Sequence, residues 1–341
     1  MDPSRRGVLS VALFSVAVTV PDWPDVVGRI EAAQKGARTR IGMSDVHTVT
    51  AMTEQLSTMD DQFGGRTARP LAAAFLVNTV APFLRTDGPE DVRKAMMSAA
   101  SDLCYLTGYM AVDEGLHGLA QRYYLKALEF AGASEDHLTY CTTLRGMSVQ
   151  AVNLGQGPTA KRLADAAAAA SPQAGPRMRA FLVGQQAHAA AQIGDRRSAL
   201  LYLHAAEVAM DKAESRGKVF GSYDPAALNY HTSRVRFEMG DVHGAIAAME
   251  ESDRLRDDIY RRTRAHHRAI LAEQQLSVGY LEAACHTWGL ALDDYPLVNS
   301  GRIDQRMTDM FHLIRPHLRN HEAQALYERA RAVVRPELIP V

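Results

Sequence analysis

Five glycines recur at nearly constant spacing along this chain, and this repetition constrains the fold more than any other sequence feature. They are Gly115, Gly155, Gly194, Gly240 and Gly279, separated by 40, 39, 46 and 39 residues. Glycine adopts the left-handed backbone conformation that ends a helix without strain at Cβ. A period of this order, with one helix stop inside each copy, predicts a tandem array of helical hairpins.

Small and bulky residues keep constant offsets from these glycines. A small residue precedes each glycine by seven positions, small residues follow it by five and twelve, and the residue nine positions after it is bulky in four of the five copies. The copies read Gly108, Ala120, Tyr124, Ala127; Ser148, Ala160, Ala164, Ala167; Ala187, Ala199, Leu203, Ala206; Ser233, Ala245, Met249, Ser252; and Ala272, Ala284, Trp288, Ala291. Small residues let two helices cross closely, and bulky ones fill the space between neighbouring hairpins.

This pattern resembles the tetratricopeptide repeat. The resemblance implies an all-α, right-handed superhelical solenoid of helix hairpins. The spacing exceeds the roughly 34 residues of that repeat, so we expect longer helices or longer links. No segment shows strand-like alternation. The alternative is a non-repetitive helical domain with alanine-rich segments.

Two flanking regions extend the array. Helical periodicity runs from Ser44, a predicted N-cap, to Asp61, and a return helix is predicted from Pro70 to Leu84 after the break at Phe63-Gly64-Gly65. At the other end, helices are predicted over residues 307–318 and 322–333. We therefore expect about seven helix pairs in one repeat domain, residues 43–334, followed by a tail, residues 335–341.

Residues 1–42 form an N-terminal apolar or junction segment. Arg5-Arg6, followed by the apolar run from Val11 to Val20, is similar to a twin-arginine export signal, but no A-x-A cleavage site follows it. The run is too short to span a bilayer. Three widely separated cysteines provide no disulfide framework. These features favour a cytoplasmic protein without membrane association, with export as the alternative.

Three motifs carry a more specific resemblance. The segments 60–65 (DDQFGG), 108–113 (GYMAVD) and 117–124 (HGLAQRYY) are similar to actinobacterial, Streptomyces-type transcriptional regulators with tetratricopeptide C-terminal regions. In that family an Xre-type helix-turn-helix DNA-binding domain precedes the repeats, and the regulators control development and secondary metabolism. This chain contains no such segment. The resemblance therefore implies a regulatory repeat module that does not bind DNA by itself.

No combination of residues predicts catalysis. The sequence has no H-E-x-x-H, no Gly-rich phosphate loop, no G-x-S-x-G and no Cys-x-x-Cys, so we expect neither an enzyme nor a cofactor or metal site. His266 and His267 are adjacent and would point about 100° apart on a helix. A formal net charge of -1 argues against a dedicated nucleic-acid binder.

One basic stretch could form a phosphate-binding stripe. It contains Arg254, Arg256, Arg261, Arg262, Arg264 and Arg268. Asp253, Asp257 and Asp258 are interleaved with these arginines. We therefore favour a salt-bridged junction between helices.

In a superhelix of this kind the first helix of each pair lines the concave face. Repeat positions 2, 5, 9, 12 and 13 share that face. The predicted groove residues are Asp102, Tyr105, Tyr109, Asp113, Arg145, Asn153, His188, Gln192, Tyr230, Arg234, Glu238, His266 and Glu273. Asn153 is the most specific candidate for a ligand contact, because its amide can both donate to and accept from a peptide backbone. The mixed charge predicts a polar or zwitterionic ligand: a peptide, a small molecule or a protein partner.

Two other functions are compatible with the sequence. The array could be a dimerisation scaffold with no ligand, using its terminal hairpins around Leu326 and Tyr327 as the contact between two copies. It could also be an exported binding protein. In either case the polar residues of the concave face could be ordinary solvated side chains.

Overall fold

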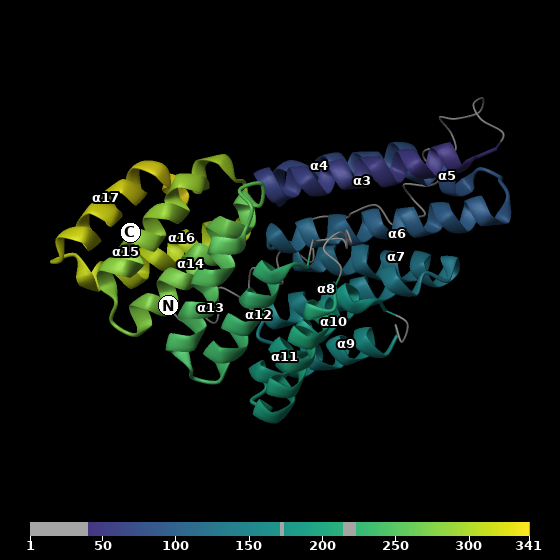
Figure 1. The fold of residues 1–341 in the computed structure, drawn as a ribbon. Coiled ribbons are helices and arrows are strands. Elements are labelled where there is room, and N and C mark those ends of the chain that lie inside the picture. The colour runs from purple at the N-terminus through teal and green to yellow at the C-terminus, as the bar shows by residue number, and fades with distance from the viewer. Residues whose placement is uncertain (1–39, 171–173, 214–222, 341) are drawn as a thin grey trace.

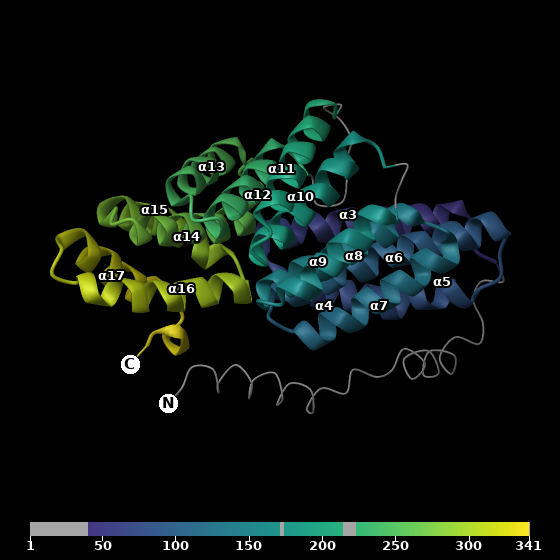
Figure 2. The same ribbon diagram turned by 90° about the horizontal axis from the view of Figure 1, so that it is seen from below.

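The computed structural model describes residues 40–170, 174–213 and 223–340. Over these residues the protein is helical and contains no strand. The N-terminal segment with Arg5-Arg6 and the apolar run lies outside the described residues. Consecutive helices pack as adjacent pairs, as Figures 1 and 2 show. The prediction of an all-α fold built from paired helices is therefore confirmed.

The helices follow the predicted order of hairpins. The pairs are α3 (Met43–Phe63) with α4 (Gly65–Phe75) and its continuation α5 (Ala81–Arg85), α6 (Glu90–Asp113) with α7 (His117–Ser134), α8 (His137–Asn153) with α9 (Gly157–Ala169), α10 (Pro176–Gln192) with α11 (Arg196–Asp211), α12 (Pro225–Glu238) with α13 (Val242–Leu255), α14 (Arg261–Ser277) with α15 (Leu281–Asp294), and α16 (Gly301–Ile314) with α17 (His321–Val333). A π-helical turn, Leu76–Val80, joins α4 to α5.

The five recurring glycines lie in the turns inside the hairpins. Their φ angles are 80°, 69°, 78°, 85° and 84°, in the left-handed region. Each turn places one helix antiparallel to the next. The predicted helix-stopping role of these glycines is confirmed.

The small residues lie where the helices of a pair cross. A Cβ added to Gly108 would approach the ring of Tyr124 to 2.9 Å. The Ser148 hydroxyl donates to the carbonyl of Ala160 at 2.8 Å, so the crossing there is equally close. The bulky position fills the layer between hairpins, since Tyr124, Met249 and Trp288 are fully buried.

Three boundaries differ from the sequence prediction. The N-cap of α3 is Gly42, not Ser44, because the Gly42 N–H donates to the Asp45 carboxylate at 3.0 Å. The return helix begins at Gly65 and contains Pro70 in its interior. Burial of the Ala68 and Ala72 face holds this helix together although Pro70 lacks a backbone donor.

The last pair also begins earlier than predicted. Helix α16 starts at Gly301 because the Ser300 side chain accepts from Ile303 N–H. Leu326 of α17 is buried, and the ring of Tyr327 packs edge-on against Phe311 at 5.2 Å. Leu326 therefore belongs to the terminal core, and the partly buried Tyr327 packs against that core.

The segment after α17 packs back on the protein. Arg335 pairs with Asp304 at 2.7 Å, and the carbonyl of Leu338 accepts from Thr308 at 3.2 Å.

Elsewhere in the described residues, the helix from Gly65 to Arg85 is long and apolar enough to cross a membrane on length and composition alone. Leu76 and Val80 of this segment are buried in the core of the first hairpins, and 28% of its apolar window is buried.

The first hairpin contacts the other end of the array. The Asn299 N–H donates to the Phe63 carbonyl at 2.7 Å, and the Arg66 N–H donates to the Asn299 carbonyl at 3.2 Å. Figure 1 shows one end of α3 and α4, in purple, beside the green helix α14. This contact between distant repeats was not predicted, and it encloses the concave face.

Candidate functional site

Two cavities lie on the concave face. The inner cavity, of about 160 Å³, is bounded by α3, α6, α8, α10, α12, α14 and α16. Residues that surround it include Asp60, Asp61, Tyr105, Tyr109, Arg145, Val149, Phe181, His188, Tyr223, Ala227, Tyr230, His231, Arg256, Arg262, His267 and Arg302. Because this wall combines aromatic faces with charged groups, it can hold a ligand that is both apolar and polar.

The outer cavity, of about 580 Å³, adjoins the inner one. The two share Val152, Asn153, His188, Tyr230, His266 and Arg302. Beyond this common wall the outer cavity adds mainly polar and charged side chains: Arg66, Glu114, Gln192, Arg234, Asp304, Arg306 and Asp309. A ligand longer than the inner cavity can therefore extend past Asn153 into a polar compartment.

Nine of the thirteen predicted groove residues line these cavities. They are Tyr105, Tyr109, Arg145, Asn153, His188, Gln192, Tyr230, Arg234 and His266. The structure thus brings together residues from five consecutive hairpins on one concave surface.

The four predicted residues that line neither cavity are the four acidic ones. Asp102 accepts from the Thr139 hydroxyl at 2.9 Å, and burial raises the pKa of Asp102 to about 7. Glu238 pairs with Arg234 at 3.3 Å, and Glu273 pairs with Arg306 at 2.7 Å. Asp113 is buried beneath the wall. The carboxylates that line the inner cavity are instead Asp60 and Asp61, which the repeat register did not predict.

Some lining residues could have been found with the same register. Phe181 and Ala227 occupy position 2 of their repeats, and Val149 and Val152 occupy positions 9 and 12 of another. Apolar residues at these positions resemble ordinary core, so the sequence does not distinguish them. Arg302 lies outside the five clear repeats, and no local signal predicts its place.

Histidines make up one side of the inner cavity. Burial, together with the guanidinium groups of Arg234 and Arg145, lowers the pKa of His188 to about 3. Burial and nearby arginines also lower the pKa values of His231, His266 and His267 well below the ordinary histidine range. All four imidazoles are therefore neutral near pH 7, and each offers one donor and one acceptor nitrogen.

Tyrosines complete the aromatic wall. Burial raises the pKa of Tyr105 to about 12. Burial also acts to raise the pKa of Tyr109, but the guanidinium groups of Arg302 and Arg262, 5.4 and 5.5 Å from its ring centroid, lower it overall. Tyr230 stacks on His267 with a centroid distance of 4.2 Å. The wall is thus a set of rings in mutual contact, of which this pair is stacked and the pair of Tyr105 and Tyr109 is tilted.

Several buried polar atoms around the cavities have no hydrogen-bond partner among the described residues. They are Asp60 Oδ1, Arg145 Nε, His188 Nε2, Gln192 Oε1, Arg256 Nε and His266 Nδ1. Buried polar atoms in folded proteins are normally paired, because an unpaired one costs about 1–3 kcal/mol. Similar atoms also lie away from the cavities, at Arg85, Tyr124, Arg264 and Trp288, but these six belong to residues that line the cavities, where a bound molecule or water could complete them.

A buried ionic network, here called the closing network, holds the wall together. It comprises Asp60, Asp61, Asp113, Arg262 and Arg302. Arg262 Nη2 lies 2.9 Å from Asp60 Oδ2 and 3.1 Å from Asp61 Oδ1, and Arg262 Nη1 lies 3.7 Å from Asp113 Oδ1. Arg302 Nε lies 3.2 Å from the same Asp113 oxygen. The network joins α3 and α6 to α14 and α16.

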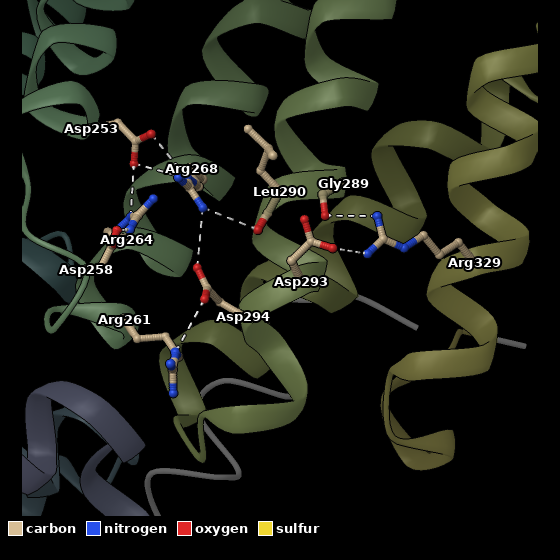
Figure 3. Close-up of polar contacts among 10 residues, drawn as sticks. All are labelled: Asp253, Asp258, Arg261, Arg264, Arg268, Gly289, Leu290, Asp293, Asp294 and Arg329. Atoms are coloured by element: carbon tan, nitrogen blue, oxygen red, sulfur yellow. Dashed lines mark hydrogen bonds and ion pairs between the residues drawn. The ribbon is translucent and has the colours of Figure 1, made fainter.

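Most of the basic stretch lies away from the cavities. Figure 3 shows Arg268 between Asp253, at 3.0 Å, and Asp294, at 3.3 Å, with Arg261 on the other side of Asp294 at 3.5 Å. Arg264 contacts Asp258 in the same cluster. The predicted salt-bridged junction is confirmed for these arginines. Arg256 and Arg262 differ, because they face the inner cavity.

The cysteines lie outside the two cavities. Cys104, Cys141 and Cys285 are buried, and none of them lines either cavity. Among the described residues, no group of three or more His, Cys, Asp or Glu side chains is placed to hold a metal ion. A scan against models of protein families and a search of curated proteins find no match to this sequence.

Proposed function

We propose that this protein is a ligand-binding repeat module that holds a small polar molecule or a short peptide in the two joined cavities. The observation that carries this proposal is the set of unpartnered buried polar atoms around a preformed, aromatic-walled space. Their desolvation is unfavourable without a ligand or water and is offset when a complementary ligand binds.

The biological setting of the module is part of the same proposal. The motifs 60–65, 108–113 and 117–124 support a cytoplasmic sensor of a Streptomyces-type transcriptional regulator, acting together with a separate DNA-binding domain. The finer description of the fold, a right-handed superhelix of tetratricopeptide-like hairpins spanning residues 43–334, also belongs to the proposal.

The arrangement suggests how binding becomes a signal. A ligand in the inner cavity touches α8, α10 and α12 on one side and α14 and α16 on the other. Its contacts bridge hairpins whose relative placement also depends on the closing network. Occupancy therefore favours one curvature of the array over others, which is a shift between conformational populations.

Affinity selection tests the proposal. The protein is incubated with a mixture of random pentapeptides and small aromatic acids, amides and amines. It is then separated rapidly by size exclusion, and retained compounds are identified by mass spectrometry. Val149→Trp and Ala227→Trp each fill the inner cavity from a different helix. Leu201→Trp, on the exposed face of α11, is the matched control.

The proposal predicts that the wild-type protein and the Leu201→Trp variant retain the same compounds, and that both cavity-filling variants lose them. Retention of no compound by the wild-type protein would count against a ligand site. Equal retention by the filled variants would place binding elsewhere on the surface and would also contradict the proposal.

A further inference from the structure

The inner cavity holds more positive than negative charge. Four guanidinium groups line it, those of Arg145, Arg256, Arg262 and Arg302, against two carboxylates, those of Asp60 and Asp61. Both carboxylates are already paired with Arg262. The histidines do not change this balance, because they are neutral near pH 7. Asp113, buried beneath the wall, pairs with both Arg262 and Arg302, so Arg145 and Arg256 are the two lining guanidinium groups without a carboxylate partner among the described residues.

Arg145 is one of these two cations, and part of its guanidinium bonds to the Tyr105 side chain. Within the described residues it forms no ion pair, and its Nε is buried without a hydrogen-bond partner. Its guanidinium lies over the ring of Phe181, 4.1 Å from the centroid. A guanidinium that packs on a ring can still donate hydrogen bonds from its edge, in the geometry that a carboxylate accepts.

His188 provides a second donor on the same wall. Its side chain is 4% exposed, and Nε2 has no partner. The His188 imidazole and the Arg145 guanidinium line the same cavity. A neutral imidazole protonated at Nε2 can donate to an anion without itself adding charge.

The remaining wall is aromatic. Tyr105, Phe181, Tyr223 and Tyr230 enclose the space beside Arg145. An enclosed volume of roughly 150 Å³ accommodates a benzene ring in a protein interior, and the inner cavity measures about 160 Å³. One planar ring thus fits the volume and the stacking surfaces together.

We propose that the inner cavity binds an aromatic group that carries a carboxylate, with the carboxylate paired to Arg145 and accepting a hydrogen bond from His188 Nε2. This inference rests on the proposed binding function and specifies its ligand class. Two sources share this chemistry: a free aromatic acid, and the C-terminal aromatic residue of a peptide whose other residues occupy the outer cavity.

Isothermal titration calorimetry with matched acids and amides tests the inference. The first probe pair is 3-phenylpropanoate and 3-phenylpropanamide. The second is the tripeptide Gly-Gly-Phe with a free C-terminus and its C-terminal amide. Each amide keeps the ring and the shape but removes the negative charge. A stronger response to the first pair indicates a free acid, and a stronger response to the second indicates a peptide terminus.

The variants are Arg145→Gln, Arg145→Lys, His188→Asn and the control Arg254→Gln, which changes an arginine on the far side of α13. We expect the wild-type protein to bind the acid of at least one pair about tenfold more tightly than its amide. The preference should disappear in Arg145→Gln, recover in part in Arg145→Lys, weaken in His188→Asn and persist in Arg254→Gln.

Equal affinity for acid and amide would overturn the carboxylate inference, as would a preference that survives Arg145→Gln. If the affinity selection retains compounds but none of these four probes binds, the ligand class is wrong while the binding function stands. If both experiments are negative, the two proposals fail together.

Discussion

Replacing Arg262 with methionine probes the contact that encloses the site. The side chain is 5% exposed and bonds with three acidic residues from α3 and α6. Methionine keeps much of the volume but removes the charge and every donor. Asp113 retains Arg302, Ser300 and Gly65 as partners after the change. Asp60 is left without a cation, because Arg262 is its one ion-pair partner among the described residues.

The expected loss is large and depends on pH. Removing one member of a buried ion pair costs about 3–5 kcal/mol. Burial already raises the pKa of Asp60 to about 7, against the opposing effect of Arg262, so removal of Arg262 raises it further. The unfolded carboxyl keeps its ordinary pKa near 3.8. The folded variant therefore retains a proton that the unfolded chain releases, and its stability falls as pH rises from about 4 through the new pKa.

Urea unfolding followed by circular dichroism at about pH 6, 7 and 8 measures this effect, with hydrogen exchange on α3 and α14 to detect local opening. The matched control is Arg254→Met, an exposed arginine paired with Glu251, which should unfold like the wild-type protein. If Arg262→Met lowers the free energy of unfolding by less than about 1 kcal/mol, the ion pairs of Arg262 do not hold α14 to α3 and α6. A loss that does not grow with pH would refute the assignment to Asp60.

Three further predictions follow from the turns, the histidines and the groove. Gly194→Ala should cost about 1–2 kcal/mol in thermal unfolding, because its φ is positive although the added Cβ would meet open space. Gly108 lies within α6 without a positive φ, and Gly108→Ala should cost more because its added Cβ would overlap the Tyr124 ring. His188 is neutral in the folded protein, with a pKa of about 3 against 6.5 in the unfolded chain. The unfolded chain therefore takes up a proton as pH falls, and the free energy of unfolding should fall by about 2 kcal/mol per such residue between pH 6.5 and about 5. His188→Gln should reduce this dependence on pH, measured by urea titrations. Asn153→Ala and Arg234→Ala should each weaken retention of ligands that reach the outer cavity, measured by affinity selection, without lowering the thermal unfolding midpoint by more than a few degrees.

Local features of the fold could be predicted because they repeat. The left-handed glycines, the close crossing at Gly108 and the buried residues at Tyr124 and Trp288 each depend on interactions within one hairpin or its neighbour. The start of the return helix was mispredicted because Pro70 normally marks a helix boundary. Tertiary burial of its neighbours outweighs that local preference.

Site residues could be predicted only at positions that have a fixed spacing from the recurring glycines. His188 and Tyr230 point into the cavities because positions 9 and 5 of a first helix face inward. Glu238 satisfies the same rule of spacing, yet it pairs with Arg234 one turn earlier on its own helix. The closing network joins residues about 200 positions apart, such as Asp60 and Arg262, and no spacing pattern encodes such a contact.

A crystal structure of the protein with the tightest-binding compound from the affinity selection would show directly whether the two joined cavities are the ligand site. We expect electron density for the compound inside the inner cavity, within hydrogen-bonding distance of Arg145 and His188. For longer ligands we expect the density to continue past Asn153. An empty inner cavity with the compound bound on the convex face, or between two copies of the chain, would contradict this expectation.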